Sequence, residues 1–208
     1  MTRILVVGAG NVGRVVGLGW LGKGHDVRFG VPEPGKSKYL GIPAERLGPA
    51  DRLSDAEVVV ITTPTDAVRQ AVIALGDLTG RTIIDCTNAV GHAPGTMTWA
   101  PPPEGSVAEQ IAALTKGASV FKSFNQTGTE NMAHIASFPQ PPAMFVAGDD
   151  AARKPLVMQL VSELGFEAID AGPLIAARLL EPMAVLWINL AYRPGGSRDF
   201  AFSVVRRA

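Results

Sequence analysis

Three glycines near the start of the chain have the spacing that allows a backbone to hold a phosphate group. Gly8, Gly10 and Gly13 form the pattern G-x-G-x-x-G, directly after the apolar run Ile4 to Val7 and at the start of a helical pattern. The first glycine permits a tight turn, the second lets the backbone approach a pyrophosphate, and the third lets the helix pack closely on the strand. Any glycine-rich turn can match by chance, but this placement in a first βα unit predicts dinucleotide binding.

The end of the second expected strand bears on which dinucleotide binds. NAD-selective domains usually carry Asp or Glu there, about 20 residues beyond the glycines, to hold the ribose 2′-hydroxyl. Here the position is Gly30-Val31-Pro32, and Glu33 comes one step late. Lys36 and Lys38 follow in the same turn and could meet a 2′-phosphate as point charges, helped by Arg14. The sequence mildly favours NADP over NAD, with solvated loop charges as the alternative role of the lysines.

The other reactive side chains do not form a recognisable acid–base set. His25, His92 and His134 lack the sequence context of a positioned base, and the chain has no G-x-S-x-G or H-E-x-x-H motif. Cys86 is the single cysteine, which excludes an intrachain disulfide and a cage of several thiolates. Hydride exchange between two cofactor rings needs little side-chain chemistry, whereas carbonyl reduction needs a proton donor. We therefore expect no catalytic side chain, with hydride passing directly between cofactors.

Composition indicates small-molecule partners. The chain has 208 residues, 19 basic and 19 acidic, and an isoelectric point near 6.8. No basic run suggests nucleic acid or anionic lipid as a partner. The longest apolar stretch, around Leu186, is interrupted by Glu181 and Asn189, so we expect no membrane span. No signal peptide is expected from the N-terminal residues, and the predicted location is cytoplasmic.

The elements that must position these residues alternate between strands and helices. This order predicts an α/β, Rossmann-type, doubly wound and mostly parallel sheet. For the helices, Thr65 is expected to be an N-cap, Ser106 to Glu109 form a capping box, and Pro155 indicates a later start or a kink. Residues 91–105 read as a surface loop and a possible lid. The expected strands are Ile4 to Val7, Val27 to Phe29, Val58 to Thr62, Thr82 to Asp85, Val120 to Ser123, Met144 to Val146 and Glu167 to Asp170.

The chain divides into a dinucleotide-binding domain, residues 1–172, and a short C-terminal extension, residues 173–208. Most of the extension reads as one apolar helix from Leu174 to Tyr192, whose periodic apolar residues suit core packing, a second-cofactor pocket or a dimer contact. Arg178 and Glu181 are expected to pair with each other across one helical turn. We expect a homodimer through this helix.

Several segments together resemble the NADP oxidoreductases that depend on coenzyme F-420, an 8-hydroxy-5-deazaflavin. The dinucleotide-binding part is also similar to that of the six-transmembrane metalloreductases. The resemblance extends over essentially the whole chain, and DAGPL followed by the AR..E pattern is its most selective part. The matching segments are GAGNVG, VVVITTPTDAV, IIDCTNAV, FKSFNQTGTENM, VAGDDAARKPLVMQLVSELGFEAIDAGPL and ARLLEPMAVLWINLAY.

This resemblance implies NADP(H) as cofactor and coenzyme F-420 or a flavin as second cofactor. It places the 2′-phosphate at Val31-Pro32, where the family commonly has Ser-Arg, so Lys36 would have to substitute here. Asn125 is expected where the second cofactor lies, or else as a polar cap. The implied contacts are Gly8, Ala9, Gly10, Asn11, Val12 and Gly13 for the pyrophosphate, and Thr62, Thr63, Pro64, Asn88 and Ala89 for the nicotinamide half.

The leading hypothesis is an oxidoreductase that passes hydride between NADP(H) and a deazaflavin or flavin. The second ring could rest against Thr63-Pro64, Phe124-Asn125 and Trp99, with Arg193 and Arg198 near an acidic cofactor tail. One alternative is an imine reductase of the pyrroline-5-carboxylate type, which is expected to need a larger helical domain than the extension provides. Another is a non-catalytic NADP(H) sensor.

Overall fold

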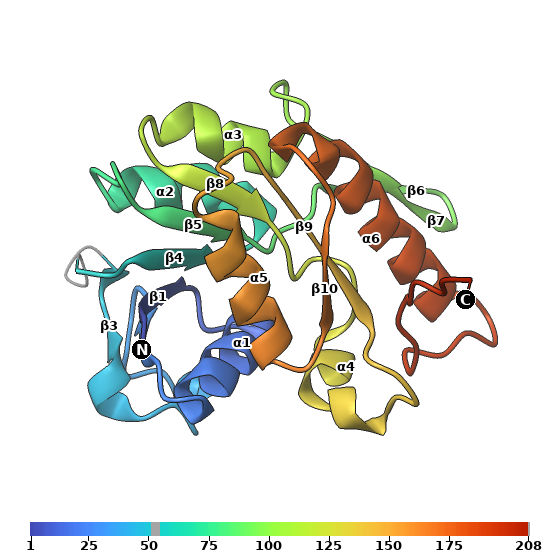
Figure 1. The fold of residues 1–208 in the computed structure, drawn as a ribbon, viewed down its shortest axis with the longest axis horizontal. Coiled ribbons are helices and arrows are strands. Elements are labelled where there is room, and N and C mark those ends of the chain that lie inside the picture. Colours follow the sequence, from blue (N-terminus) through green and yellow to red (C-terminus); the bar gives the residue numbers. More distant parts are fainter. Residues whose placement is uncertain (51–54, 208) are drawn as a thin grey trace.

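A sheet of eight strands, in the order β10-β9-β8-β5-β4-β1-β2-β3, runs through the molecule (Figure 1). This computed structural model describes residues 1–50 and 55–207. All neighbouring strands pair in parallel except β8 and β9, which are antiparallel. The predicted Rossmann-type, mostly parallel sheet is therefore confirmed. The strands are β1 (Arg3–Val7), β2 (Asp26–Gly30), β3 (Leu47–Gly48), β4 (Val58–Ile61), β5 (Thr82–Asp85), β8 (Ser119–Lys122), β9 (Ala143–Gly148) and β10 (Glu167–Asp170).

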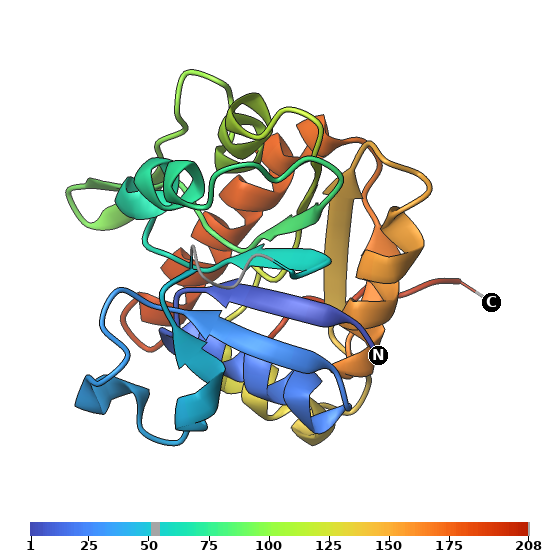
Figure 2. The same cartoon turned by 90° about the vertical axis from the view of Figure 1, so that its left-hand side faces the viewer.

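Helices cover both faces of the sheet, which explains why the central strands are continuous apolar runs (Figure 2). Helices α1 (Asn11–Gly22), α4 (Thr129–Ala133) and α5 (Lys154–Glu163) pack on one face. On the other face lie α2 (Val68–Ala74), α3 (Val107–Leu114) and the start of α6 (Ala177–Tyr192). The alternation of strand side chains between these two clusters builds two separate cores.

Two of the expected helix starts are found and one is wrong. Ser106 accepts from the Glu109 backbone N–H at 3.2 Å, which is the N-cap half of the predicted capping box. The Glu109 carboxylate returns to Ser106 as well, but it accepts from the hydroxyl at 2.8 Å and not from the backbone N–H. Helix α5 begins at Lys154 with Pro155 in its first turn, where a proline costs no hydrogen bond. Thr65 does not cap α2, because a 3₁₀ turn precedes the helix and the Thr65 hydroxyl donates to the Asn88 carbonyl at 2.6 Å.

Part of the segment expected to be a surface loop forms a hairpin. Strands β6 (Val90–Ala93) and β7 (Thr96–Trp99) pair antiparallel around Gly95, whose φ of 78° suits the turn. The Asn189 side chain on α6 accepts from the Met97 N–H at 2.8 Å and donates to the Met97 carbonyl at 2.9 Å. The hairpin is thus fastened to α6, and the structure gives no support to a free lid.

The predicted C-terminal helix is present as a 3₁₀ turn, Leu174–Ala176, that continues into α6. By length and hydropathy this stretch could cross a membrane, but half of its most apolar window is buried inside the structure, as in a core helix. The predicted Arg178–Glu181 pair is wrong, because the two side chains leave α6 in different directions. Arg178 pairs with Glu109 at the surface at 2.8 Å, whereas Glu181 is fully buried. The division at residue 172 stays a prediction.

Candidate functional site

The glycine turn has the geometry that its sequence predicts. Gly8 takes a φ of 99°, in the region that favours glycine, and its N–H donates to the Gly30 carbonyl at 2.9 Å. A Cβ on Gly13 would lie 2.3 Å from the Gly8 carbonyl oxygen and 2.4 Å from Thr62 Oγ1, so only glycine can pack there. A Cβ on Gly10 would meet nothing within 4 Å, which leaves its backbone open to a ligand.

The turn lies where the strand order reverses. From β1 the chain goes to β2 and β3 on one side, then returns to β4 on the other side of β1. In doubly wound sheets ligands bind at such a switch point, beyond the carboxyl ends of the strands. Helix α1 begins there with Gly10 as N-cap and without a side chain that caps its N–H groups. Its positive end therefore suits a phosphate. Ala9 is buried, Asn11 is exposed and Val12 is half-buried.

An apolar cavity adjoins the turn on the β2 side. Its volume is about 310 Å³, and it brings Val31 and Pro32 together with Gly8 and Thr63. The buried Thr63 hydroxyl has no hydrogen-bond partner among the described residues. Such a cavity suits the adenosine half of a dinucleotide, with Val31 and Pro32 as walls and no cationic grip. The cavity is lined by Val7, Gly8, Gly30, Val31, Pro32, Pro49, Ala50, Thr63, Ala71 and Ala74.

The three cations expected to meet a 2′-phosphate are not equally available. Lys36 pairs with Glu33 at 2.7 Å, which raises the pKa of Lys36 through a hydrogen bond and the carboxylate charge. Lys38 lies over the Tyr39 ring, with Nζ 5.0 Å from its centroid. The Arg14 guanidinium reaches the same loop, since a Cβ on Gly41 would be 2.4 Å from its Nη2. Among the described residues no ion pair of Arg14 is found, so its charge is the most available of the three.

Polar side chains bridge the carboxyl ends of β4, β5 and β8. Thr62 Oγ1 lies 3.1 Å from the Val7 carbonyl oxygen and 3.0 Å from that of Gly8, which ties β4 to the glycine turn. Asn88 and Asn125 bond twice, through Asn88 Nδ2 to the Asn125 carbonyl and Asn125 Nδ2 to Asn88 Oδ1, both at 2.9 Å. Asn88 is half-buried and therefore accessible in part, whereas its neighbour Ala89 is buried and Pro64 is exposed.

Asn125 is a bridge between elements. Besides Asn88, its amide donates to the Leu180 carbonyl at 3.0 Å and accepts from Gln126 at 2.7 Å. Phe124 before it takes a φ of 58°, which is unusual for a bulky residue and turns the chain after β8. All these partners belong to the chain itself, so the structure favours the polar-cap role of Asn125 over direct contact with a second cofactor.

A buried cluster of charged side chains lies next to the Asn88–Asn125 pair, at the ends of β5 and β8. The sequence did not predict this cluster. We call Lys122, Asp85 and Glu181 the Lys122 cluster; all three side chains have no exposed surface. Lys122 Nζ donates to Asp85 Oδ2 at 2.7 Å, to Glu181 Oε1 at 2.8 Å and to the Thr87 carbonyl at 2.5 Å. Burial alone would lower the pKa of Lys122, but the two carboxylates outweigh burial and raise it.

The Lys122 cluster joins elements that are distant in the sequence. Glu181 on α6 accepts from the Val107 N–H at the start of α3, at 2.9 Å, and from Trp99 Nε1 on β7, at 3.2 Å. This bond anchors Trp99 and the end of the hairpin to α6. Glu181, the acidic residue in the ARLLEP segment, is the one sign of the cluster in the sequence, but helical spacing predicts an ion pair with Arg178 on the same helix.

The histidines lie outside the candidate site. His25 Nε2 is 2.7 Å from Glu163 Oε2, and its Nδ1 faces the Thr2 N–H at the amino ends of the strands. His134 contacts the Glu130 carbonyl, and His92 is exposed on the hairpin. Burial raises the pKa of the Cys86 thiol, which makes it a poor nucleophile. No group of residues suited to a metal ion occurs in the described part of the chain.

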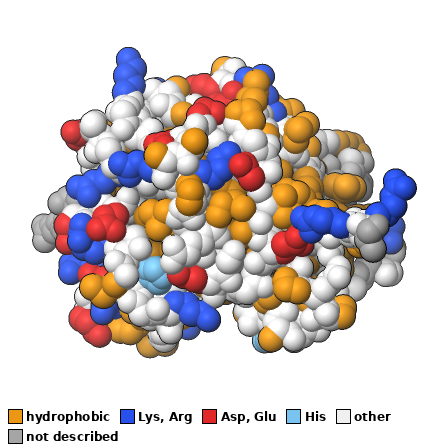
Figure 3. Space-filling model, viewed as in Figure 1, with side chains coloured by type: hydrophobic (Ala, Val, Ile, Leu, Met, Phe, Trp, Pro, Cys, Tyr) orange, Lys and Arg blue, Asp and Glu red, His pale blue; other side chains and the backbone are white. Residues whose placement is uncertain are grey.

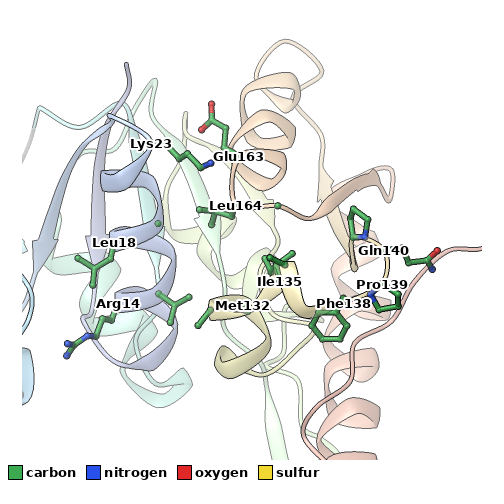
Figure 4. A pocket seen from close by; sticks show the side chains of 16 residues that line it. Arg14, Leu18, Lys23, Met132, Ile135, Phe138, Pro139, Gln140, Glu163 and Leu164 are labelled. Atoms are coloured by element: carbon green, nitrogen blue, oxygen red, sulfur yellow. The ribbon is translucent and has the colours of Figure 1, made fainter.

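A larger cavity, about 680 Å³, lies between α1 and the segment around α4 (Figure 4). Arg14 and Leu18 on α1 and Lys23 just after it border the cavity on one side, and Met132 and Ile135 border it on the other. The cavity does not include the glycines of the turn, Thr63 or Asn88, so size alone does not identify the candidate site.

Comparison with known proteins gives consistent relatives. The family model described as "NADP oxidoreductase coenzyme F420-dependent" matches residues 3–89. The F420-dependent NADP reductase of Methanocaldococcus jannaschii is 27% identical over 174 residues, covering 77% of this chain and 75% of the relative. That of Methanothermobacter thermautotrophicus is 26% identical over 214 residues, covering 93% and 90%.

Solved structures agree. A protein of Arthrobacter sp. FB24, provisionally described as an F420-dependent NADP reductase, superimposes with a TM-score of 0.87 at 27% identity, covering 99% of this chain and all of the other. A reductive aminase of Aspergillus terreus in complex with NADPH shares the fold, with a TM-score of 0.63 at 20% identity, covering 89% of this chain and 60% of the aminase. The predicted resemblance is confirmed: in sequence and in structure, the chain is similar to the F420-dependent NADP reductases.

Proposed function

We propose that this protein is an oxidoreductase that exchanges hydride between NADP(H) and a deazaflavin of the coenzyme F-420 type. The observation that carries the proposal is the open glycine turn at the switch point between β1 and β4. The choice of coenzyme F-420 as second cofactor rests on the names of the relatives, which are F420-dependent NADP reductases. Neighbours from the imine-reducing enzymes, at 20% identity or less, share the fold and support nothing beyond it.

The residues present suit NADP(H). The backbone from Gly8 to Gly13, including Ala9, Asn11 and Val12, would hold the pyrophosphate at the α1 N-terminus. The adenosine half would enter the apolar cavity beside Val31 and Pro32. Arg14 would meet the 2′-phosphate, with Lys36 as a second cation once it separates from Glu33. The opposite end of the nucleotide would lie over Thr62, Thr63, Pro64, Asn88 and Ala89.

The work of the chain is to orient and shield the cofactors. When bound, the two cofactors supply the hydride chemistry themselves. Asn125 and Thr65 hold the half-buried Asn88 in place through hydrogen bonds to its side chain and its backbone carbonyl. The second N–H of its amide group would therefore be presented to a cofactor from a fixed position. The hairpin is anchored to α6 through Trp99 and Asn189. This arrangement favours direct transfer through proximity, without a proton donor from the protein.

Stopped-flow absorbance of reduced nicotinamide tests the proposal. The protein and NADPH are mixed in turn with coenzyme F-420, FMN and FAD. We expect rapid loss of NADPH with the deazaflavin and slower or no loss with the flavins. Binding of NADPH without oxidation by any acceptor would contradict the proposal and favour a nucleotide sensor.

We also propose a cytoplasmic homodimer that contacts through α6. Ile175, Leu179 and Leu186 form one exposed apolar stripe, with Leu179 72% exposed, and hydrophobic side chains gather where α6 lies in Figure 3. Light scattering should give the mass of a dimer, and Leu179→Asp should reduce it to that of a monomer. A wild-type monomer at micromolar concentration would contradict the dimer.

A further inference from the structure

We infer that the Lys122 cluster biases the site toward the oxidised nucleotide, so that NADP⁺ binds more tightly than NADPH and hydride flows toward the second cofactor. The inference rests on the proposed function. It concerns side chains that neither contact the cofactor nor take part in the chemistry, so Lys122, Asp85 and Glu181 are positioning residues in this account.

The hydrogen bonds show that both carboxylates in the cluster are ionised. Asp85 Oδ1 accepts from the Thr87 N–H at 2.9 Å and from the Thr87 hydroxyl at 2.7 Å, and Oδ2 accepts from Lys122. Glu181 Oε1 accepts from Lys122 and Val107, and Oε2 accepts from Trp99. Every carboxylate oxygen faces a hydrogen-bond donor. A protonated carboxyl group would have to donate its O–H to an acceptor, and neither group faces one.

Lys122 is ionised for the complementary reason. Its three N–H groups face three acceptors, which are the two carboxylates and the Thr87 carbonyl. Two carboxylates and one ammonium leave the cluster with one excess negative charge in a site without exposed surface. Because the surroundings are buried, this charge acts over a longer range than it would in water.

The surrounding elements do not cancel that charge completely. Glu109 and Arg178 are the remaining charged side chains on α3 and α6, and they pair with each other at 2.8 Å. The positive end of α3 reaches Glu181 through the Val107 N–H and offsets about half a charge at most. An excess of negative charge remains.

The cluster lies next to the region assigned to the nicotinamide half. Lys122 binds the carbonyl of Thr87, the residue before Asn88, and Asn125 follows β8 by three residues. The nicotinamide ring is neutral in NADPH and carries one positive charge in NADP⁺. A fixed negative charge close to the nicotinamide half would therefore stabilise the oxidised form relative to the reduced form. By linkage, tighter binding of NADP⁺ makes the bound NADPH a stronger hydride donor.

Calorimetric titration of the full chain with NADP⁺ and with NADPH, without a second cofactor, tests the inference. In the wild-type protein we expect the smaller dissociation constant for NADP⁺. Glu181→Gln removes the excess charge, and the preference for NADP⁺ should fall by about tenfold, the order expected for one elementary charge acting through protein. A merely structural role would weaken both nucleotides equally and leave their ratio unchanged.

Matched variants keep the test decisive. Glu163→Gln makes the same chemical change beside His25, at the other end of the strands, and should leave the ratio within twofold of wild type. If Glu181→Gln does not fold, Asp85→Asn carries the measurement in the same direction. Tighter binding of NADPH than NADP⁺ by the wild-type protein, or an unchanged ratio in a folded cluster variant, would overturn the inference. Failure of the wild-type protein to bind either nucleotide would instead contradict the proposed function.

Discussion

The glycine turn is formed by backbone atoms within residues 8–13, whereas the Lys122 cluster is formed by side chains that lie 37 and 59 residues apart. The turn presents open N–H groups, and its glycines are set by close packing at Gly13 and by open space for a ligand at Gly10. The cluster is closed, fully bonded and specific for each of its members. One half of this site therefore depends on backbone shape and the other on charge pairing. Mutations should therefore affect the two halves through different observables.

The largest expected effect is on folding, from loss of the buried cation. Lys122→Met would leave two carboxylates together without exposed surface, and we expect it to lower the free energy of unfolding by about 3–5 kcal/mol. Urea denaturation measures this. Lys36→Met, at an exposed ion pair, is the control and should match the wild-type protein. A loss below about 1 kcal/mol for Lys122→Met would mean that the cluster is not a single charge unit.

These two halves also differ in how far sequence reasoning reaches. Gly8, Gly10 and Gly13 were identified because their roles depend on near neighbours in the chain and on an invariant backbone geometry. The same is true of the parallel strands, whose buried runs are local signals. Glu181 was assigned to Arg178 because helical spacing reports only neighbours on one helix. Its real partners come from β7, β8 and α3, and only the tertiary fold brings them together.

The next effect is on nucleotide binding, from closing the turn. The Cβ of Gly13→Ala would overlap the Gly8 carbonyl and Thr62, and relieving it should cost about 1–3 kcal/mol. We expect the affinity for NADP⁺ to fall by about tenfold or more as the turn shifts. Gly22→Ala in the same helix meets nothing within 4 Å and should bind as the wild type does. Equal behaviour of the two variants would contradict the account of the turn.

A smaller effect concerns the choice between NADP and NAD. Arg14→Ala should weaken NADP⁺ by about tenfold, the size of a charge-assisted hydrogen bond, and leave NAD⁺ nearly unchanged. Lys36→Ala should have the weaker effect, because Lys36 already pairs with Glu33. Titration of each variant with both nucleotides gives the two ratios. If Lys36→Ala lost more of the preference for NADP⁺ over NAD⁺ than Arg14→Ala, the main contact of the 2′-phosphate would be Lys36 and not Arg14.

The smallest effect is on stability, from the surface ion pair between Glu109 on α3 and Arg178 on α6. Burial would raise the pKa of Glu109, but hydrogen bonds from Arg178 and Ser106 outweigh it and hold the pKa below its ordinary value of 4.5. A carboxyl group whose pKa is lowered by folding stabilises the folded state. This stabilisation is complete above the pKa of the unfolded state and is lost as the pH falls through the pKa of the folded state. Arg178→Ala should remove up to about 1 kcal/mol near neutral pH and less in acid. A loss that grows as the pH falls would contradict this sign.

Transfer of deuterium from NADPH tests whether hydride passes directly between the two cofactors. NADPH carrying deuterium at the transferable C4 position is mixed with the protein and coenzyme F-420, and the products are analysed by mass spectrometry. Because we expect a direct hydride exchange without a protein acid or base, the deuterium should appear in the reduced deazaflavin. Deuterium in the solvent, or NADPH that stays unoxidised, would contradict the account.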